Sequence, residues 1–576
     1  MQENGTDHDV VIVGAGPTGT LLAIELGRRG IDVRVVERRR ERLRHPRASG
    51  IHARTMELFR QLDLGDEIRR ASGLPSDDWS RYVYLTRLNR PPLGVFDQML
   101  NADRVAQARG QSPEMHAWCA QDRLEDVLRK RLRTFATVTL DEGVRATGIT
   151  ENTDSVELTL VDEATGAEET VSARYLVGAD GGRSAVRRAA GIASQESPPL
   201  SHQVNVCFEA DLTPYIGDEV GVLHWIVNPD TQGCVITYDG ARQWVYSWEY
   251  DPETLARDHF TPQRCTDVIR AAVGVPDLDI RIRGTFFWQI DSALADSFGR
   301  GRVYLVGDAA HRFPPAGGFG MNSGLQDVQN LAWKLHEVLR GTASPDLLAT
   351  YGTERRATAI SNTDLTLFNA RKTAEVGWIL TDPDSIADIE LPQGEATRRR
   401  IAEAIPGQEA QYWSYGQQFG RIYESAAVVP DGTPLPEHSV TDYRPSAQPG
   451  AHAPHVRLTG PEGRELSTID LLHSRFVLLT PPAGHEWAEA ARETARRRGI
   501  AIDTYVIGDR GDYTDPDGDW ADCYGLGDTG AVLVRPDGHV AFRAPALSPD
   551  QDAAVLLGDV FARLFGTHPA RALVKG

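Results

Sequence analysis

Three glycines near the amino terminus have the spacing of a turn that binds a dinucleotide. Gly14, Gly16 and Gly19 follow the apolar run VVIV, and an acid, Glu37, ends the next apolar run, VRVV. In such a turn the first glycine permits a tight bend, the second lets the backbone approach a pyrophosphate, and the third lets a helix pack closely on a strand. Because a carboxylate at Glu37 can accept a hydrogen bond from a bare ribose hydroxyl, the pattern favours FAD or NAD over a 2′-phosphorylated dinucleotide.

A second stretch suited to ligand binding is RVYLVGDAAHRFPPAGGFGMNSGLQDVQNLAWKLHEVL, residues 302–339. Its pattern predicts a buried strand that ends at Gly307-Asp308, a loop of glycine and proline, and an amphipathic helix. The helix is expected to begin at Ser323, because Gln326 follows it at the spacing of a capping box. The end of a strand and the amino terminus of a helix would then face one crevice, where free backbone N–H groups and the helix dipole favour negative charge.

Other predicted elements also carry polar residues at their ends. The stretch around the glycine turn predicts a strand, a helix and a second strand. Residues 41–70 form an arginine-rich loop with a PRA motif at Arg47, followed by a helix. Gln121 opens another helix, and residues 173–188 predict a strand that ends in GADG, the motif containing Asp180. Strands that alternate with helices in this way are typical of an α/β fold with a parallel sheet.

Five features of the chain together resemble those of the flavoprotein aromatic hydroxylases of the para-hydroxybenzoate hydroxylase type. They are the glycine turn with Glu37, the PRA motif, the Gln121 helix, GADG and the GDAAH…GxN stretch. Within that family the chain looks most like bacterial phenol hydroxylases and hydroxylases of aromatic polyketides. The resemblance implies a non-covalently bound FAD, NADH or NADPH and O2 as co-substrates, and a small aromatic substrate, phenolic or polycyclic. In such enzymes reduced FAD and O2 form a C4a-hydroperoxide that transfers its distal oxygen to the ring.

The resemblance also implies which residues hold the cofactor. Asp308 is expected at the ribityl chain, Asp180 near the pyrophosphate, and the backbone of residues 320–322 at the pyrimidine edge of the flavin. A positive helix end at that edge would stabilise the negative charge of reduced flavin. The residues expected to contact FAD are Gly14, Gly16, Pro17, Gly19, Glu37, Arg38, Arg47, Gln121, Asp180, Asp308, Pro315, Gly318, Gly320, Met321 and Asn322.

Residues 194–300 have a different character. They contain segments rich in β-branched and aromatic residues, separated by turns, and predict a largely antiparallel sheet that by resemblance roofs the substrate pocket. The phenol hydroxylases place a carboxylate after the PRA motif, but here that segment reads Ser49-Gly50-Ile51-His52, so the group that deprotonates the substrate stays unassigned. No metal site is expected. Weak catalytic candidates are His52, His224 and Tyr246, and the aromatic pocket candidates are Trp225, Tyr238, Tyr246, Trp248 and Trp288.

The expected fold class is α/β, with a Rossmann-like FAD-binding domain, an inserted, mostly antiparallel substrate-binding sheet, and a thioredoxin-like domain at the carboxyl end. This last domain has the order β-α-β-β-β-α. Its one cysteine, Cys523, cannot form the thiol pair that redox work needs, so a structural role or a subunit interface in a homo-oligomer is expected. The expected ranges are 1–75, 105–195 and 291–345 for the FAD-binding domain, 76–104 and 196–290 for the sheet, 346–429 for a helical region, 430–454 for a proline-rich linker and 455–576 for the thioredoxin-like domain without CxxC.

Composition excludes several classes of partner. The chain has 61 Lys and Arg residues against 81 Asp and Glu, a net charge of −20, which argues against binding to nucleic acid or to an anionic membrane. The five scattered cysteines are typical of a protein in the reducing cytoplasm, and no apolar run is long enough for a membrane span. A Baeyer–Villiger oxygenase on the same scaffold, and a flavin-binding protein without turnover, are the alternatives to an aromatic hydroxylase.

Overall fold

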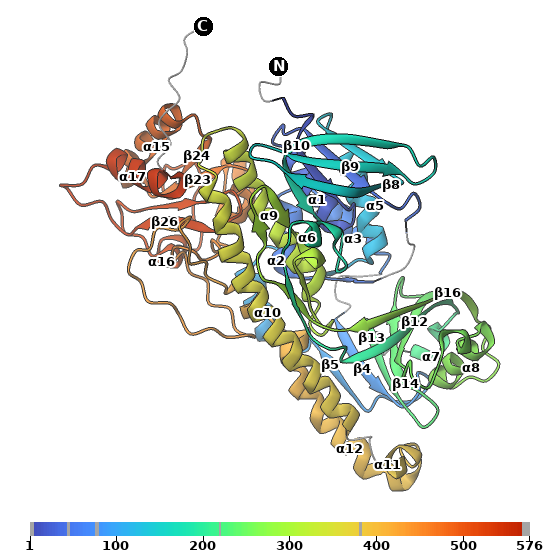
Figure 1. Cartoon of the computed structure of the whole chain (residues 1–576). Helices are drawn as coiled ribbons and strands as arrows, with labels where there is room; N and C mark the ends of the chain where they lie inside the picture. Colours follow the sequence, from blue (N-terminus) through green and yellow to red (C-terminus); the bar gives the residue numbers. More distant parts are fainter. Residues whose placement is uncertain (1–4, 43–46, 75–79, 218–220, 379–382, 567–576) are drawn as a thin grey trace.

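The computed structural model describes residues 5–42, 47–74, 80–217, 221–378 and 383–566. Its first sheet has a parallel core in the order β7-β2-β1-β10-β19. This is the doubly wound order of dinucleotide-binding folds, and it confirms the expected Rossmann-like α/β class. An antiparallel pair, β8 and β9, continues the sheet from β10 at the top of Figure 1. The strands are β1 (His8–Val13), β2 (Val33–Glu37), β7 (Val138–Glu142), β8 (Val144–Glu151), β9 (Val156–Asp162), β10 (Glu168–Gly178), β18 (Gly299–Arg300) and β19 (Val303–Leu305).

Three helices lie beside this sheet, two of them packed against the third. Helix α1 (Pro17–Gly27) contacts both α5 (Gln121–Leu132) and α9 (Phe319–Leu339). The predicted helices after the glycine turn and at Gln121 are therefore present. Their apolar residues join those of the strands in one buried core, which holds the carboxyl ends of the parallel strands and the amino end of α9 in fixed positions.

The predicted start of α9 at Ser323 is wrong. The helix begins at Phe319, and its N-cap is Gly318, which has a left-handed backbone with φ of 73°. Glycine adopts this conformation without the steric cost that a Cβ brings, so the loop can turn directly into the helix. Ser323 therefore lies inside the helix, where its Oγ accepts a hydrogen bond from Asn362 Nδ2 at 2.9 Å.

A second sheet, at the lower right of Figure 1, has the order β16-β12-β15-β14-β13-β4-β5. All its neighbouring pairs are antiparallel except β4 with β13, which confirms a mostly antiparallel sheet. Helix α8 (Pro262–Val273) covers one face, where Cys265, Ile269 and Ala272 pack in the core. The strands are β4 (Arg81–Leu85), β5 (Gly94–Asp97), β12 (Ser201–Glu209), β13 (Leu223–Val227), β14 (Gln232–Thr237), β15 (Gln243–Glu249) and β16 (Arg281–Ile290).

One long helix, α10 (Asp346–Trp378), runs across the front of the molecule in Figure 1, from the C-terminal part to the region of α12. It packs against α9 and, further along, against the short helices that follow it. The remaining helices used below are α2 (Ala53–Arg60), α3 (Gly65–Ser72), α4 (Ala102–Gln111), α6 (Ala185–Ala189), α12 (Glu395–Ala404), α13 (Glu409–Tyr412) and α14 (Tyr415–Phe419).

The C-terminal part has its own sheet, in the order β24-β23-β25-β26. From β23 onward its elements follow the predicted β-α-β-β-β-α order, with a short additional helix, α16 (Trp520–Tyr524), before β25. Burial raises the pKa of the Cys523 thiol to about 11, so this thiol is un-ionised at neutral pH, in keeping with a non-redox role. The elements are β23 (Phe476–Thr480), α15 (His485–Arg498), β24 (Ile502–Val506), β25 (Ala531–Val534), β26 (Val540–Ala544) and α17 (Ala553–Phe565).

Residues 430–454 contain neither a helix nor a strand longer than a single bridge, and while residues 432–438 are exposed, residues 447–454 are buried. Tyr443 is buried, and its carbonyl oxygen accepts a hydrogen bond from Gln111 Nε2 at 2.7 Å. The Gly450 N–H donates to the carbonyl oxygen of Val540 at 2.8 Å. This segment therefore contacts α4 on one side and β26 on the other.

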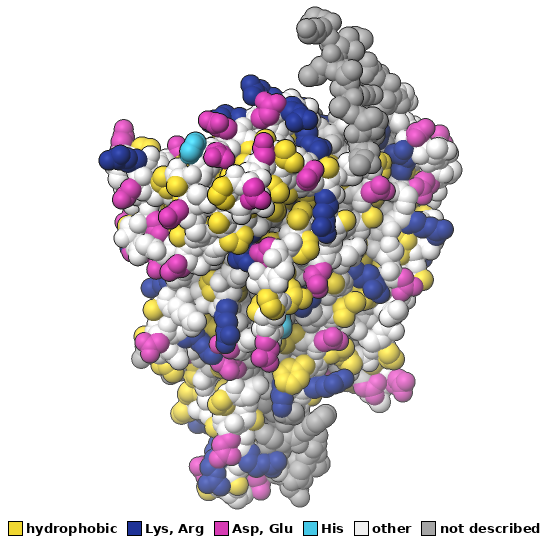
Figure 2. Space-filling view, turned by 90° about the vertical axis from the view of Figure 1, so that its left-hand side faces the viewer, with side chains coloured by type: hydrophobic (Ala, Val, Ile, Leu, Met, Phe, Trp, Pro, Cys, Tyr) yellow, Lys and Arg dark blue, Asp and Glu magenta, His cyan; other side chains and the backbone are white. Residues whose placement is uncertain are grey.

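Acidic and basic side chains alternate over the face of the molecule that Figure 2 shows, and no large patch of one sign gathers there. In the part of the chain that the structure describes, no helix combines the length and the apolar character needed to cross a membrane.

Candidate active site

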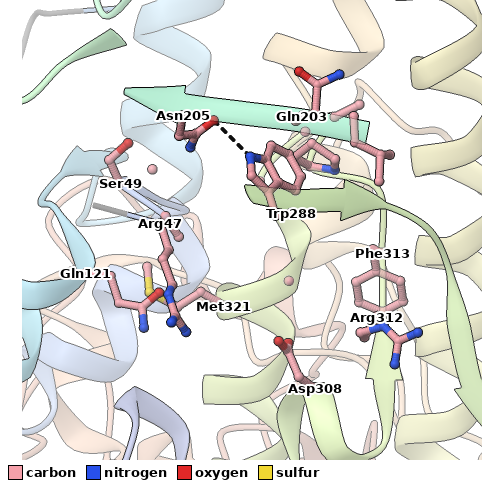
Figure 3. Close-up of a pocket in the computed structure, with 18 of the residues that line it drawn as sticks. Arg47, Ser49, Gln121, Gln203, Asn205, Trp288, Asp308, Arg312, Phe313 and Met321 are labelled. Atoms are coloured by element: carbon pink, nitrogen blue, oxygen red, sulfur yellow. Dashed lines mark hydrogen bonds between the residues drawn. The ribbon is translucent and has the colours of Figure 1, made fainter. Parts of the chain in front are cut away.

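A cavity of about 1540 Å³ lies between the first sheet, the second sheet and α9. In Figure 3, Arg47, Gln121 and Asp308 border one part of this space, while Asn205 and Trp288 approach it from the second sheet. The expected cofactor residues that line the cavity are Gly14, Gly16, Pro17, Glu37, Arg38, Arg47, Gln121, Asp180, Asp308, Pro315, Gly318, Gly320 and Met321.

The three glycines of the turn are required for different physical reasons. Gly14 has φ of 106°, and a Cβ there would overlap the Ala179 carbonyl oxygen. Gly19 does not line the cavity, and a Cβ on it would overlap the carbonyl oxygen of Gly14, so its role is to let α1 pack on the turn. Gly16 has no atom within 4 Å of the position of a Cβ, which leaves open space where a pyrophosphate would approach the backbone.

Glu37 lies at the carboxyl end of β2 and is held by two backbone groups. Its Oε2 accepts a hydrogen bond from the Ala15 N–H at 3.0 Å, and its Oε1 accepts one from the Arg39 N–H at 3.0 Å. Each carboxylate oxygen can accept a second hydrogen bond. The carboxylate is therefore fixed in orientation while it keeps acceptor capacity for a ribose hydroxyl.

The amino end of α9 forms part of the cavity wall through Gly320 and Met321. The first backbone N–H groups of a helix have no acceptor within the helix, and the N-cap residue, Gly318, supplies no side-chain cap. A Cβ on Gly320 would also have no atom within 4 Å, so the helix end is open toward the cavity. This end favours negative charge on a group bound beside it.

Asn322, whose backbone was expected at the pyrimidine edge of the flavin, is not among the residues that line the cavity. Its Nδ2 donates to the carbonyl oxygens of Gly318 at 2.7 Å and Gly50 at 3.0 Å, and its Oδ1 accepts from the His52 N–H at 2.9 Å. Because α9 begins at Phe319, residue 322 lies on the protein side of the first turn. The side chain holds the segment after the PRA motif against α9.

The two expected aspartates differ in their contacts. Asp180 Oδ2 accepts hydrogen bonds from the N–H groups of Ala185 at 2.6 Å and Val186 at 3.2 Å, at the start of α6. Its buried Oδ1 has no hydrogen-bond partner among the described residues, so it can accept one from a bound ligand. The Asp308 side chain is exposed within the cavity, although the surrounding protein desolvates its carboxyl and raises its pKa. Both carboxylates, with Glu37 and the α9 end, fit the polar groups of FAD.

Arg312 also lines the cavity and was not among the predicted residues. Its guanidinium donates to both carboxylate oxygens of Asp291, at 3.0 and 3.1 Å, and to the carbonyl oxygen of Gly182 at 2.9 Å. It follows His311 in the motif GDAAHR, so its place next to Asp308 in the sequence was the available signal. It brings a positive charge to the cavity, near Asp308 (Figure 3).

His52 lines the cavity but is a poor base at neutral pH. Its Nε2–H donates to the Gly317 carbonyl oxygen at 2.8 Å, and burial lowers the pKa of the imidazole to about 4. The ring lies edge-on to Phe319, with the two centroids 4.9 Å apart. The side chain therefore holds the glycine loop in front of α9.

His224 and Tyr246 do not line the cavity, so the structure does not support their candidacy as catalytic residues. Side chains alternate between the two faces of a strand, and the neighbours of His224, Leu223 and Trp225, are on the cavity face. Tyr246 is likewise directed to the α8 side, where its hydroxyl hydrogen-bonds with the hydroxyl of Thr231 at 2.7 Å.

The aromatic pocket candidates divide in a similar way. Trp225, Trp248 and Trp288 line the cavity, and Trp288 Nε1 donates to Asn205 Oδ1 at 2.8 Å. Tyr238 does not, because its hydroxyl donates to the Asp122 carboxylate at 2.6 and 2.7 Å. Several residues outside the range 194–300 also line the cavity and were not predicted. They are Tyr82, Tyr84, Gln98, His116 and Tyr412. The alternation of side chains in the segment RYVYL could have indicated the first two.

Comparison with known families identifies the chain. Residues 7–366 match the family described as FAD binding domain, and residues 446–568 match the family described as aromatic-ring hydroxylase, C-terminal. The chain belongs to the FAD-dependent aromatic-ring hydroxylases. Its cofactor is FAD, which the family resemblance implied and which is one of the two dinucleotides that the glycine turn with Glu37 favours.

Individual relatives of this hydroxylase match it over nearly the whole chain. Tetracenomycin A2 monooxygenase-dioxygenase of Streptomyces glaucescens is 35% identical, with 98% of each chain covered. The crystal structure of the flavin-dependent monooxygenase PieE in complex with FAD and substrate is 31% identical with a TM-score of 0.90, covering 97% of this chain and 99% of the other. Aklavinone-11 hydroxylase, solved with FAD and aklavinone, is 31% identical with a TM-score of 0.82, covering 98% and 100%.

The Glu37→Ala variant of this hydroxylase is expected to bind FAD more weakly by about 1.5–3 kcal/mol, the contribution of a hydrogen bond to a charged group. The Ala15 and Arg39 N–H groups would also lose their acceptor, so the turn itself becomes less ordered. Titration of the apoprotein with FAD, followed by flavin fluorescence, measures the change. An unchanged dissociation constant would contradict the assignment of Glu37 to the ribose.

Proposed function

We propose that this hydroxylase oxygenates a phenolic or polycyclic aromatic substrate of the polyketide type, with NADH or NADPH and O2 as co-substrates. The supporting observation is the cavity volume of about 1540 Å³, because a pocket for one drug-sized ligand measures roughly 300–1,000 Å³. FAD and an aromatic substrate can share a space of this size. Two similar proteins are named for tetracenomycin A2 and aklavinone, which makes substrates of that kind the first to test.

Bound FAD supplies the chemistry with O2, and the chain supplies binding, orientation and the exclusion of water. Glu37 holds the adenosine end, and the amino end of α9 favours negative charge on the group that binds beside it. On the opposite side, the indoles of Trp225 and Trp288 give flat apolar surfaces against which an aromatic ring can be oriented.

Two histidines border the space assigned to the substrate, and neither is charged at neutral pH. Burial lowers the pKa of both His52 and His116 to about 4. Buried His116 Nε2 has no hydrogen-bond partner among the described residues. We assign both imidazoles to positioning through neutral hydrogen bonds and not to removal of the substrate proton.

The direct test uses the purified, FAD-loaded protein and a panel of phenols, naphthols and hydroxyanthraquinones. A substrate should increase the rate of NADH or NADPH oxidation, and mass spectrometry should find a product that has gained one oxygen atom. A protein that binds FAD but shows no stimulation with any member of the panel would refute the proposal and favour a flavin-binding role without turnover.

The loop before α9 should control how well oxidation is coupled to product. We infer that the flavin ring moves past Arg47 and residues 314–318, so Gly318→Val should obstruct it and increase the share of NAD(P)H lost to hydrogen peroxide. Gly341→Val is the matched control, because Gly341 also has φ of 73° but lies beyond the end of α9 with no atom within 4 Å of a Cβ. Peroxide and product are measured against NAD(P)H consumed, with FAD content checked. Equal coupling in the two variants would refute the gating role.

A further inference from the structure

Three side chains form a hydrogen-bonded group on the part of the cavity wall that the second sheet and α13 supply. Trp225 Nε1 donates to the Tyr412 hydroxyl oxygen at 3.0 Å, and the Tyr84 and Tyr412 hydroxyl oxygens are 3.0 Å apart. All three residues line the cavity. Tyr84 is 2% exposed and Tyr412 6% exposed, so bulk water has little access to either.

Several contacts hold this group in place. Strands β4 and β13 pair in parallel with Tyr84 opposite Trp225, which places both side chains on the cavity face. The ring of Tyr412 stacks on Tyr82, with the centroids 3.7 Å apart. The side-chain amide of Gln98 donates to the backbone carbonyl oxygen of Tyr412. Because both the ring and the backbone of Tyr412 are held, the group can present a hydrogen at a defined position.

This group has one more donor hydrogen than its internal hydrogen bonds use. The group has three donor hydrogens, one on the indole and one on each phenol, but an indole N–H cannot accept. The indole uses one hydrogen on Tyr412, and the contact between the two hydroxyls uses a second. Neither hydroxyl has a further partner among the described residues, so one phenolic hydrogen has no acceptor among them.

The acid–base state of the phenols keeps this hydrogen in place. Burial raises the pKa of Tyr84 and of Tyr412 above the ordinary value, so both remain protonated at physiological pH. A buried donor without an acceptor costs free energy, and a ligand that supplies an acceptor recovers it. The group is therefore suited to an uncharged acceptor such as a carbonyl oxygen.

We propose that Tyr84, Tyr412 and Trp225 form a subsite for a ring carbonyl oxygen of the substrate. The inference rests on the proposed function and narrows it. The three residues come from β4, β13 and α13, and none of them is an expected cofactor residue, so we assign the subsite to the part of the cavity left for the substrate. The substrate class is then a fused-ring phenol with a ketone or quinone oxygen, and not a simple phenol.

Two rigid tricyclic phenols of similar shape test the subsite, namely 2-hydroxy-9-fluorenone and 2-hydroxyfluorene, which differ in the ring carbonyl. Equilibrium dialysis against the FAD-loaded protein should show about tenfold tighter binding of the ketone, which corresponds to about 1.4 kcal/mol. The carbonyl stretch of the bound ketone, measured by infrared difference spectroscopy, should lie below its frequency in hydrocarbon solvent. This second measurement needs no variant.

Variants then locate the donor. The triple substitution Tyr84→Phe, Tyr412→Phe and Trp225→Phe removes all three hydrogens and should abolish both the preference for the ketone and the shift of the carbonyl stretch. Removing one hydroxyl alone leaves another donor within the group, so the triple variant is the decisive one. Tyr246→Phe is the matched control, since it removes a buried hydroxyl from the other face of the same sheet and should leave the preference unchanged.

The outcomes separate this inference from the proposed function. Equal affinity for the two probes with an unshifted carbonyl stretch would overturn the subsite, as would a preference that persists in the triple variant. Binding and stimulated NAD(P)H oxidation with simple phenols, but exclusion of both tricyclic probes, would also overturn the subsite while the hydroxylase function stands. No binding and no stimulation with any aromatic compound would overturn both.

Discussion

Replacing Arg535 with methionine is expected to lower the free energy of unfolding by about 3–5 kcal/mol, the usual cost of removing one partner of a buried ion pair. The Arg535 guanidinium donates to the two carboxylate oxygens of Glu354 at 2.7 and 2.8 Å and to Asp537 at 3.0 Å, and all three residues are buried. Lys334 Nζ also donates to Glu354, at 2.8 Å. Methionine would leave Asp537 and part of Glu354 without compensating charge, and so loosen the contact between the C-terminal sheet and α10.

The measurement is denaturant-induced unfolding of the FAD-loaded protein, followed by circular dichroism. Arg496→Met is the matched control, because Arg496 pairs with Glu493 at 2.6 Å on the exposed side of α15. An exposed pair of this kind contributes about 0–1 kcal/mol. If the two variants lose similar stability, the buried group does not hold the C-terminal part against α10.

Placing valine at Gly16 is expected to weaken FAD binding by two orders of magnitude or more while the fold is kept. The backbone at Gly16 has φ of −70° and ψ of −178°, a conformation that valine adopts readily, and no atom lies within 4 Å of the new Cβ. The side chain would instead occupy the space of the pyrophosphate and block its hydrogen bonds to backbone N–H groups. Two such bonds to a charged group contribute about 3 kcal/mol or more, which corresponds to about 100-fold in affinity.

Two further glycine variants serve as comparisons for Gly16→Val. Gly407→Val places the same side chain at an exposed site outside the cavity, also with no atom within 4 Å, and should leave FAD binding unchanged. Gly19→Ala should instead destabilise the protein, because its Cβ meets the Gly14 carbonyl oxygen. FAD titration and thermal unfolding of the three apoproteins separate the effects. Unaltered FAD affinity in Gly16→Val would refute the placement of the pyrophosphate at this turn.

Features that depend on local pattern could be predicted from the sequence. The turn with Gly14, Gly16 and Glu37 was recognisable because its residues lie on consecutive elements, strand, helix and strand, so their spacing follows from the geometry of those elements. The parallel Rossmann-like core and the mostly antiparallel second sheet followed from the same kind of periodicity. The start of α9 did not, because Gly318 in a left-handed conformation starts the helix ahead of the apparent capping box.

Only the tertiary structure decided which side of each element faces the cavity. Alternation along a strand separates two faces but does not say which one a helix will cover, so His224 and Tyr246 were candidates until α8 was placed over their side of the sheet. Contacts between distant residues left no local signal at all. Tyr84 and Tyr412 are 328 positions apart, and Glu354 and Arg535 are 181 apart, yet each pair is joined by hydrogen bonds. The sequence by itself determined the class of fold and the turn for a dinucleotide, because these depend on short-range spacing. The set of side chains that lines the cavity and the attachment of the C-terminal part depend on long-range packing.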